Sequence, residues 1–587
     1  MSEHNKETTT DLFSTVTKHL KRYRFYLISG GVCIIASNLL LLLLPYITKI
    51  VFDLLEQQGT DRERLNWVLI LIALAFLSGL FRFLTRRTVI WMSRRVEYDL
   101  RGEVFRHLLT LSPSYYDKTR TGDIMARMTS DLEAIRMMVG PGIMHFTSTI
   151  VTFVIALSFM VYLSPRLTLY SLVPMVLFPL VANRVGNLVH RRAMRIQDHF
   201  SVLTASVQEN IAGIRVVKAY RQEENETEHF AGLSRQYLDL NMDMARLYAA
   251  MVPILFLLAS LLMLSALYFG GLEVMNDVVP LGTLVAFFAY LSMLIWPAVA
   301  LGWVVSLYQR GKASLQRINR ILHTEPDIKQ SADKLHAEKM RGHIAFRALD
   351  FKYNGTRVLR GIELTIEPGQ TIGLVGRTGS GKTTLVSLLA HLYPIDRGQL
   401  FIDGVDINDW DLSALRRQIG FATQEPFLFS DSLGDNIRFG VTGATDESVE
   451  QAASTAALTK DVDTFADRFS TIIGERGITL SGGQKQRTAI ARAILTDPAV
   501  LVLDDATSSV DTETEDEINQ RISSVLAGRT SIIISHRVSS VKGADRILYL
   551  EDGRIVEQGP HEELIALGGR YHDLHRSQLL AEQLENL

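Results

Sequence analysis

The sequence predicts a two-part chain, in which a six-helix all-α transmembrane domain with long cytoplasmic helical extensions precedes an α/β P-loop domain. Three observations predict it. Every long apolar run of the 587 residues lies before residue 310 or so, and after it short apolar strands alternate with polar helical stretches. A glycine-rich loop of the phosphate-binding type follows one of those strands. We expect residues 1–325 to form the membrane domain, 326–340 a linker and 341–587 the second domain.

The composition favours a bilayer as partner and excludes two other classes. Hydrophobic residues make up 47% and charged residues 21%, a balance too apolar for a disordered chain. Lys and Arg number 61 against 63 Asp and Glu, so the net charge of −2 lacks the basic excess of a nucleic-acid binder. The single cysteine, Cys33, excludes disulfides within the chain and any multi-cysteine zinc site. We expect no nucleic-acid partner.

Six apolar runs are long enough to cross a hydrocarbon core of about 30 Å. They are Tyr26–Ile50, Trp67–Leu84, Gly142–Leu163, Leu167–Val185, Leu247–Gly270 and Val279–Val305. An even number of spans places both termini on one side. Arg and Lys concentrate in the connections after the second and fourth spans, which makes these connections and both termini cytoplasmic. The first span is too long and lacks a small-residue cleavage site, so we expect no removable signal peptide.

The two cytoplasmic connections continue the membrane helices into the cytosol. Each has some fifty residues with almost no Pro or Gly and an apolar period typical of helices, as in Val96–Leu111 and Phe200–Ala219. At about 1.5 Å per residue, the turns lie about 40 Å below the bilayer. We place these turns at Ser114–Asp123 and Asn210–Tyr220. Each is either a solvated hairpin or a short crosswise helix that docks on the cytosolic domain; the second is favoured because that domain needs a mechanical contact.

The second half of the sequence contains a phosphate-binding loop. Residues 376–383 match G-x-x-x-x-G-K-[ST], after a strand-like Thr371–Val375 and before a helix-like segment. In such a loop, backbone amides cradle phosphate oxygens, Lys382 reaches the β- and γ-phosphates and the Thr383 hydroxyl ligates Mg²⁺. Asp504, at the end of an apolar strand, is the magnesium-side acid. A plain strand-to-turn junction at Asp504 is the alternative. ATP and Mg²⁺ are the expected cofactors.

Between these elements stands Leu480-Ser481-Gly482-Gly483-Gln484, which opens a helix. With the phosphate loop, it makes the chain resemble ATP-binding cassette (ABC) transporters over its whole length, as a half-transporter of the multidrug and lipid exporter group. The resemblance implies that Tyr353 stacks on adenine, that Gln424 contacts Mg²⁺ and senses the membrane domain, and that Tyr115–Asp123 couples the two domains. It also implies an exporter-specific loop at Gly474-Glu475-Arg476-Gly477 and an interface-crossing segment, Ser508–Asp511.

The resemblance assigns the site residue by residue. Catalytic roles fall to Asp505, His536 and Gln424, and Mg²⁺ ligation to Thr383, Gln424 and Asp504. The nucleotide is held by Tyr353, Gly376, Arg377, Thr378, Gly379, Ser380, Gly381, Lys382, Thr383, Thr384 and Gln424 and, across a dimer, by Ser481, Gly482, Gly483 and Gln484. In the family, a signature serves the nucleotide of the opposite cassette, and such exporters use twelve spans. The chain therefore needs a second half-transporter.

One departure from the family pattern points to the kind of partner. Most members have Glu after the magnesium-side acid, to position the attacking water, and here that residue is Asp505. Its carboxylate falls about 1.5 Å back, and since misplacement by about 1 Å can cost a hundredfold in rate, this site should hydrolyse slowly. An Asp that works through a second water is the alternative. Because the family's heterodimers pair such an Asp with a partner that keeps Glu, we read the chain as the degenerate-site subunit. A homodimer and a nucleotide-gated regulatory or channel-type subunit are the alternatives.

The cargo leaves little trace in the sequence. Polar residues within the spans are Asn38, His145, Thr147 and Thr149, and the sixth span adds Phe287, Phe288, Tyr290 and Trp296. Aromatic residues at helical spacing are more often packing than a drug pocket. His145 is either a site residue or bonded to a neighbouring helix. By resemblance alone, we expect an amphipathic or hydrophobic small-molecule cargo and a place in the bacterial plasma (inner) membrane.

Overall fold

The structure is a computed structural model that describes residues 12–57, 60–329, 339–474, 477, 479–509 and 512–585. Within these ranges, the side chains of 172–180 and of a few other helical positions are not described. The chain forms two compact units: residues 1–110 with 119–325, and residues 111–118 with 326–587. Each unit is considered by itself.

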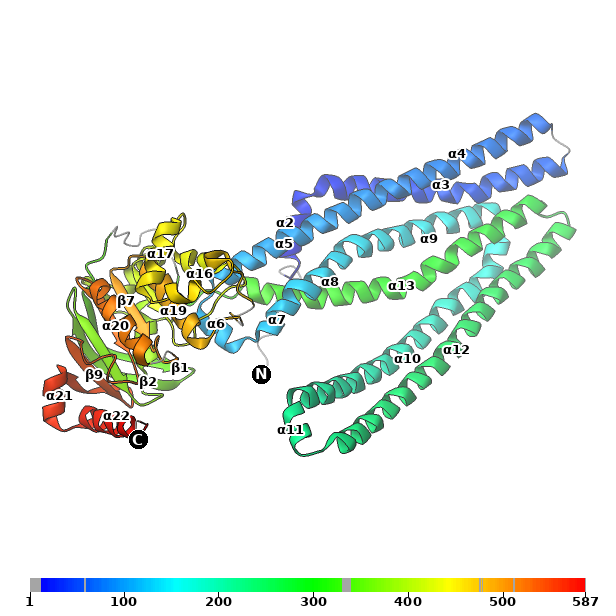
Figure 1. The fold of residues 1–587 in the computed structure, drawn as a ribbon. Coiled ribbons are helices and arrows are strands. Elements are labelled where there is room, and N and C mark those ends of the chain that lie inside the picture. The colour runs from blue at the N-terminus through cyan, green and yellow to red at the C-terminus, as the bar shows by residue number, and fades with distance from the viewer. Residues whose placement is uncertain are drawn as a thin grey trace. The chain divides into compact units, whose positions relative to one another are not determined.

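The first unit consists of helices. They are α2 (Ser14–Arg22), α3 (Arg24–Glu56), α4 (Asp61–Thr85), α5 (Trp91–Thr110), α7 (Thr121–Ala126), α8 (Leu132–Met137), α9 (Ile143–Leu163), α10 (Pro165–Ala212), α11 (Ile214–Ala219), α12 (Glu223–Met275) and α13 (Leu281–Leu322). π-Helical turns at Arg86–Ile90, Arg127–Asp131 and Met138–Gly142 join α4 to α5, α7 to α8 and α8 to α9. The long helices run in pairs, α3 beside α4 and α10 beside α12, and α13 packs on α3 and α9 (Figure 1).

Five helical stretches of the described chain are long and apolar enough to cross a membrane. They are Arg24–Glu56, Asp61–Thr110, Thr121–Leu163, Glu223–Met275 and Leu281–Leu322. Four of them contain an expected span, and Leu281–Leu322 contains all but the first two residues of Val279–Val305. The sixth span, Leu167–Val185, lies in α10, where the side chains of 172–180 fall outside the description. Large apolar side chains such as Phe76 lie 75% exposed on the unit's surface, as lipid-facing helices require. The interior aromatics Phe287 and Tyr290 are fully buried, which makes them packing residues.

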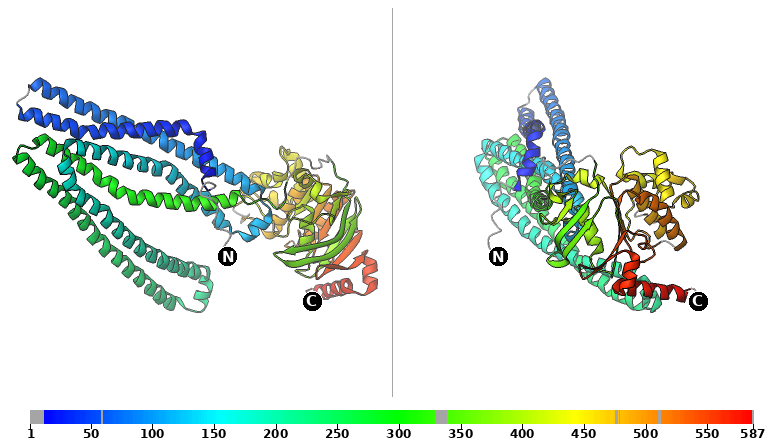
Figure 2. Two further views of the ribbon diagram at one scale, coloured as in Figure 1. Left: turned by 180° about the vertical axis from the view of Figure 1, so that it is seen from behind. Right: turned by 90° about the vertical axis from the view of Figure 1, so that its left-hand side faces the viewer.

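The helices are much longer than a membrane is thick. α10 has 48 residues and α12 has 53, which at a rise of about 1.5 Å per residue gives rods of about 72 and 80 Å. The two rods lie side by side, and the short helix α11 joins their ends at the second expected turn (Figure 2). A short helix, α6 (Pro113–Lys118), also forms at the first expected turn.

The second unit is built on two sheets. One is antiparallel in the order β2-β1-β4-β5, with β1 (Ile344–Tyr353), β2 (Thr356–Ile366), β4 (Leu400–Ile402) and β5 (Val405–Asp406). The other has the order β10-β9-β3-β8-β7-β6, with β3 (Thr371–Gly376), β6 (Ile419–Ala422), β7 (Val500–Asp504), β8 (Thr530–Ile534), β9 (Arg546–Glu551) and β10 (Arg554–Gly559). The neighbours from β9 to β6 pair in parallel, and β10 is antiparallel.

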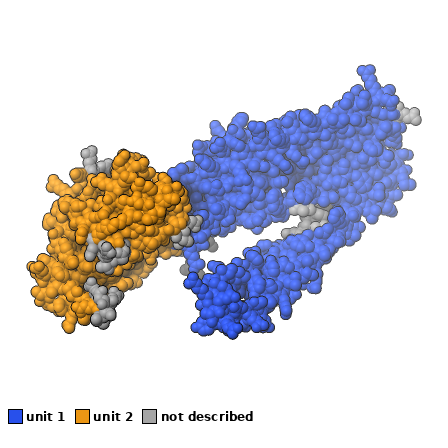
Figure 3. Space-filling model, viewed as in Figure 1, with its two compact units in different colours: residues 1–110, 119–325 blue, residues 111–118, 326–587 orange. Residues whose placement is uncertain are grey.

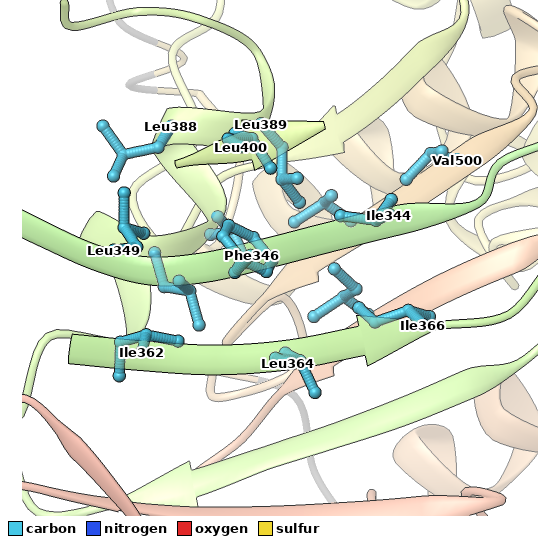
Figure 4. Close-up of a cluster of buried hydrophobic side chains, with 14 of the residues drawn as sticks. Ile344, Phe346, Leu349, Ile362, Leu364, Ile366, Leu388, Leu389, Leu400 and Val500 are labelled. Atoms are coloured by element: carbon cyan, nitrogen blue, oxygen red, sulfur yellow. The ribbon is translucent and has the colours of Figure 1, made fainter. Parts of the chain in front are cut away.

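A hydrophobic core fills the space between the two sheets and the helix that follows β3. Side chains of β1, β2 and β4 meet Leu388 and Leu389 of α14 (Lys382–Leu389) and Val500 of β7 (Figure 4). Phe346, at its centre, is 2% exposed, and burying such a ring stabilises the fold by about 1.5–3 kcal/mol. This core fixes β3 and α14, between which the phosphate loop lies.

Helices form a second layer on the opposite face of β7. Successive β7 residues alternate between the two cores, with Val500 and Val502 in the first and Leu501 and Leu503 in the second, because strand side chains point to opposite faces. The helices of this unit after α14 are α15 (Leu412–Arg417), α16 (Leu433–Ile437), α17 (Asp446–Thr455), α18 (Thr459–Val462), α19 (Gly482–Leu495), α20 (Thr512–Leu526), α21 (His561–Leu567) and α22 (Arg570–Glu585). Of these, α16 to α20 contribute to the second core.

The division into units differs from the expected boundaries in one respect. Residues 111–118, which we expected in the membrane domain, group with the second unit (Figure 3). Two side-chain contacts hold them there. The Tyr393 hydroxyl donates to an Asp117 carboxylate oxygen at 3.1 Å, and the Ser114 hydroxyl bonds to Asp327. Most of the expected linker, residues 330–338, lies outside the described residues.

Candidate nucleotide site

The predicted site residues gather at one edge of the larger sheet. β3, β8, β7 and β6 are successive neighbours, and Leu374 pairs with Ile534, which pairs with Asp504. The carboxyl ends of parallel strands meet at the same edge, where open α/β sheets bind ligands. The phosphate loop follows β3, His536 follows β8 and Gln424 follows β6.

The phosphate loop needs glycine for both its conformation and its close packing. Gly376, Gly379 and Gly381 have φ values of +146°, +82° and +103°, which L side chains rarely adopt. A Cβ atom on Gly376 would lie 2.2 Å from the Leu550 carbonyl oxygen, and one on Gly381 would lie 2.8 Å from a methyl group of Leu359. At Gly376 and Gly381 the loop therefore passes too close to its neighbours for a side chain.

The polar side chains of the loop fit a phosphate group. Lys382 is 6% exposed, and its ammonium donates to the carbonyl oxygens of Gly376 at 2.9 Å and Arg377 at 3.0 Å. Burial lowers the pKa of Lys382. The Ser380 hydroxyl is buried and has no hydrogen-bond partner within the described residues, a state that costs about 1–3 kcal/mol. A buried cation and an unpaired hydroxyl beside the N-terminus of α14 suit a polyanion.

Asp504 and Thr383 form the candidate magnesium position. Asp504 is 2% exposed, and burial raises the pKa of its carboxyl group, while a hydrogen bond with the Thr383 side chain acts in the opposite direction. Both side chains offer the oxygen ligands that Mg²⁺ prefers. The described part of the chain contains no group of three His, Cys, Asp or Glu side chains able to hold a metal. Mg²⁺ at this position would therefore need phosphate oxygens or waters as further ligands.

The three predicted catalytic residues are brought together around the Asp505 carboxylate. Its Oδ1 accepts the backbone N–H of His536 at 3.3 Å, and its Oδ2 accepts the Gln424 amide at 3.4 Å. Oδ2 also lies 3.7 Å from Nε2 of His536. Asp505 is 7% exposed and has a φ of +50°, a left-handed conformation that Asp tolerates better than most residues. Both oxygens thus face the protein's own donors.

Tyr353 ends β1 within a group of aromatic rings. Its ring meets Tyr393 edge-on at a centroid distance of 5.1 Å and Phe351 at 4.8 Å. Burial raises the pKa of Tyr353, and its hydroxyl also bonds to Thr384, next to the phosphate loop, and to Tyr393. Tyr393 in turn donates to Asp117. A continuous series of contacts therefore runs from the turn at 111–118 to the phosphate loop.

Sequence reasoning missed Tyr393. The only local sign of its role in the sequence is that it is an aromatic residue shortly after α14, the helix that follows the phosphate loop.

The signature forms a capped helix start and does not meet the phosphate loop of its own chain. Ser481 is the N-cap of α19: its hydroxyl accepts the Gln484 backbone N–H at 3.3 Å, and the Gln484 side chain accepts the Ser481 N–H at 2.9 Å. The Gln484 amide also donates to Asp461 at 3.0 Å. Ser481 and Gly482 are exposed, whereas Gly483 is buried. No hydrogen bond among the described residues joins this signature to residues 376–384.

A buried glutamine that sequence reasoning also missed connects the signature helix to the catalytic segment. Gln486 is 3% exposed, donates to the Ser508 hydroxyl at 2.8 Å and accepts the Ser509 N–H at 2.9 Å. Its amide also lies 3.4 Å from the Asp505 carbonyl oxygen. A shift of α19 would therefore move the backbone beside Asp505. Of the expected exporter loop and interface segment, Glu475, Arg476, Val510 and Asp511 lie outside the described residues.

The chain matches two family models. Residues 27–298 match the ABC transporter transmembrane region, and residues 359–508 match the ABC transporter model. The first match covers most of the helical unit, and the second contains the phosphate loop, the signature and Asp505.

Similar proteins extend the match over nearly the whole chain. A probable multidrug resistance ABC transporter ATP-binding/permease protein of Bacillus subtilis, YheI, is 38% identical, covering 86% of this chain and 89% of its own length. The multidrug resistance-like ATP-binding protein MdlA of Escherichia coli is 32% identical, covering 98% of both chains, and an ATP-dependent lipid A-core flippase of Syntrophus aciditrophicus is 32% identical over 98% and 96%. A solved bacterial Atm1-family ABC exporter with ATP bound superposes with a TM-score of 0.78 at 25% identity, over 95% and 98% of the chains. The chain therefore belongs to the ABC transporter family, as a multi-pass membrane exporter whose transmembrane region is followed by an ATP-binding cassette.

Proposed function

We propose that the chain is one half of a heterodimeric exporter, in which its own ATP site hydrolyses slowly and its signature completes the partner's site. The geometry around Asp505 carries this proposal. Both carboxylate oxygens are engaged by Gln424 and His536, at distances of 3.3 to 3.7 Å. A carboxylate held in this way, one methylene short of Glu, is poorly placed to orient a water at the γ-phosphate.

The remaining residues of the site suit tight binding. The amides of 376–383 and the buried Lys382 would hold the phosphates, and Thr383, Asp504 and Gln424 would hold Mg²⁺. When bound, Mg-ATP supplies the γ-phosphoryl bond whose hydrolysis drives transport. His536 would hold a γ-phosphate oxygen, and Tyr353 would stack on adenine once its ring turns a face to the base. The chain's own site would thus bind Mg-ATP firmly and turn it over seldom.

The exposed Ser481 and Gly482 support the second half of the proposal. They leave hydroxyl and amide donors at the surface, where a second cassette can meet them. Donors aimed at developing charge are worth about 10²–10³ in kcat at comparable sites. Ser481 of this chain would therefore matter for the partner's turnover and not for its own.

Tyr393 is proposed as the residue that links transport to nucleotide. It lies between Asp117, on the turn between two membrane helices, and Tyr353, which bonds to Thr384 beside the phosphate loop. Movement of the turn at 111–118 would reach the loop through two tyrosine side chains. The same turn was expected from its sequence to couple the two domains.

The class of transported molecule and the membrane that holds the protein are proposed from similar proteins. Similar proteins are described as multidrug transporters and lipid A-core flippases, so we propose an amphipathic or hydrophobic cargo moved by alternating access. The charge of the connections supports cytoplasmic termini, and the bacterial relatives support a place in the bacterial inner membrane.

Reconstitution tests the proposal. We expect the purified chain alone to show little ATPase, and the chain with its native copurified partner to hydrolyse ATP and to accumulate an amphipathic dye in vesicles against a gradient. Robust turnover by a verified homodimer would refute the heterodimer. ATP-dependent flux that never exceeds equilibrium would instead support a nucleotide-gated pathway, the alternative that Asp505 favours.

A further inference from the structure

The helical unit contains a cationic cavity at the end of the second membrane span. The cavity has a volume of about 330 Å³ and is lined by residues of α3, α4, α9 and α13 and of the π-turn after α4. Two of them, Arg82 and Arg86, lie one helical turn apart and therefore on the same face. No acidic residue lines the cavity.

The two guanidinium groups have no counter-ion. Across the described residues, neither Arg82 nor Arg86 forms an ion pair or a hydrogen bond, whereas Arg94, Arg101 and Arg136 farther along the chain all pair with Glu97. Charged side chains within membrane helices are rare, face the bundle interior or a water-filled cavity, and mark substrate pathways. An unpaired pair of arginines facing one cavity is therefore a candidate site for an anion.

Asn38 and Ser148 of the cavity lining are already hydrogen-bonded. The Asn38 carbonyl oxygen accepts from Ser148 at 3.2 Å and from Thr152 at 3.0 Å, and the Asn38 amide donates to the Ile34 carbonyl oxygen at 2.8 Å. The bonds to Ser148 and Thr152 join α3 to α9. Arg82 and Arg86 remain as the charged donors of the lining, and His145 also lines the cavity. Arginine forms bidentate bonds with phosphate and carboxylate groups, which gives the cavity a preference for such headgroups.

The rest of the lining is apolar and suits a hydrocarbon body. Ile34, Met144 and Ala300 line the cavity, together with Trp296, which is 72% exposed. A Trp ring also attracts cations, but two full positive charges in the same cavity outweigh the quadrupole of one ring. The position of Arg82 at the cytoplasmic end of its span would hold a headgroup at the level of the inner leaflet.

We propose that this cavity binds the anionic headgroup, phosphate or carboxylate, of an amphipathic cargo through Arg82 and Arg86. The proposal rests on the proposed export function and specifies the charge of its substrate. Arg87, the next residue of the π-turn, is exposed like Arg82 and Arg86 but does not line the cavity, which makes it a matched control.

Equilibrium binding without ATP tests the proposal. The full-length chain in phosphatidylcholine nanodiscs is titrated with labelled dodecyl phosphate, dodecyltrimethylammonium and inorganic phosphate, with empty nanodiscs as background. We expect dodecyl phosphate to bind at least tenfold more tightly than the other two. Arg82→Gln and Arg86→Gln should each weaken it by about tenfold or more, the usual value of a charge-assisted bond, and Arg87→Gln by less than twofold.

Each contrary result overturns a specific part of the proposal. Equal binding of the anionic and cationic amphiphiles would refute a cationic site. An equal loss in Arg87→Gln would reduce the effect to general surface charge, and equally tight inorganic phosphate would refute an amphipathic ligand. Should the glutamine variants fail to fold, the preference of the wild-type protein still decides. Because the assay contains no ATP, failed transport with intact binding would refute the export function alone.

Discussion

Replacing Asp505 by Glu tests whether this chain's own site is slow for lack of one methylene. The carboxylate would reach about 1.5 Å farther from β7, past its present contacts of 3.4 Å to Gln424 and 3.7 Å to His536. Because misplacement by about 1 Å can cost a hundredfold, we expect hydrolysis at this site to rise by about 10- to 100-fold. Azido-ATP labelling with vanadate trapping, which identifies the chain that holds the nucleotide, measures it.

The same substitution should lower stability, because of its backbone conformation. Asp505 has a φ of +50°, and a residue less tolerant of the left-handed region than Asp adds strain of up to about 1 kcal/mol. Asp277→Glu is the matched control, since Asp277 has a φ of +53° in an exposed turn of the helical unit, away from the nucleotide site. Both variants should lose a similar amount of thermal stability, and only Asp505→Glu should gain turnover. Unchanged turnover in Asp505→Glu, with Mg-ATP still bound, would refute the reasoning.

Three further predictions follow from the site. Ser481→Ala should lower the total ATPase activity of the assembled pair by about 10²-fold or more, and vanadate should then trap less nucleotide at the partner's phosphate loop. Loss of trapped nucleotide at this chain's own phosphate loop would contradict the composite site. Tyr393→Phe removes the bond to Asp117 and should lower transport per ATP about fivefold or more, whereas Tyr571→Phe, which also loses a hydroxyl bond, should not. Asp504 has a raised pKa in the folded state, so its contribution to stability is present at acid pH and lost as the pH rises through that pKa. Asp504→Asn should therefore raise Tm of nucleotide-free protein at neutral pH, flatten the pH dependence of Tm and abolish Mg²⁺-dependent nucleotide binding.

The parts of the site that could be predicted are local in sequence. Gly376 and Gly381 indicate a loop with positive φ. The apolar run of β7 indicates a buried strand, and Asp504 is the last residue of that strand. Because β3, β8, β7 and β6 pair in parallel, the residues that follow these strands lie at one edge of the sheet. The meeting of Gln424, Asp505 and His536 could therefore be predicted from the order of strands known for the family. Gln486 escaped prediction because a glutamine within a helix reads as a surface residue until its burial is known.

The two-part architecture, the phosphate loop and the altered acid at 505 can be read from the amino-acid sequence, since each depends on a short run of residues and its periodicity. Which distant residues meet depends on the tertiary structure. Tyr393 and Asp117 are 276 residues apart, and the cavity around Arg82 and Arg86 takes its walls from four helices. Helical periodicity shows which residues share a face, but which face meets which neighbour depends on how whole helices pack. That packing is the sum of many weak contacts spread over the chain, and no local pattern contains it.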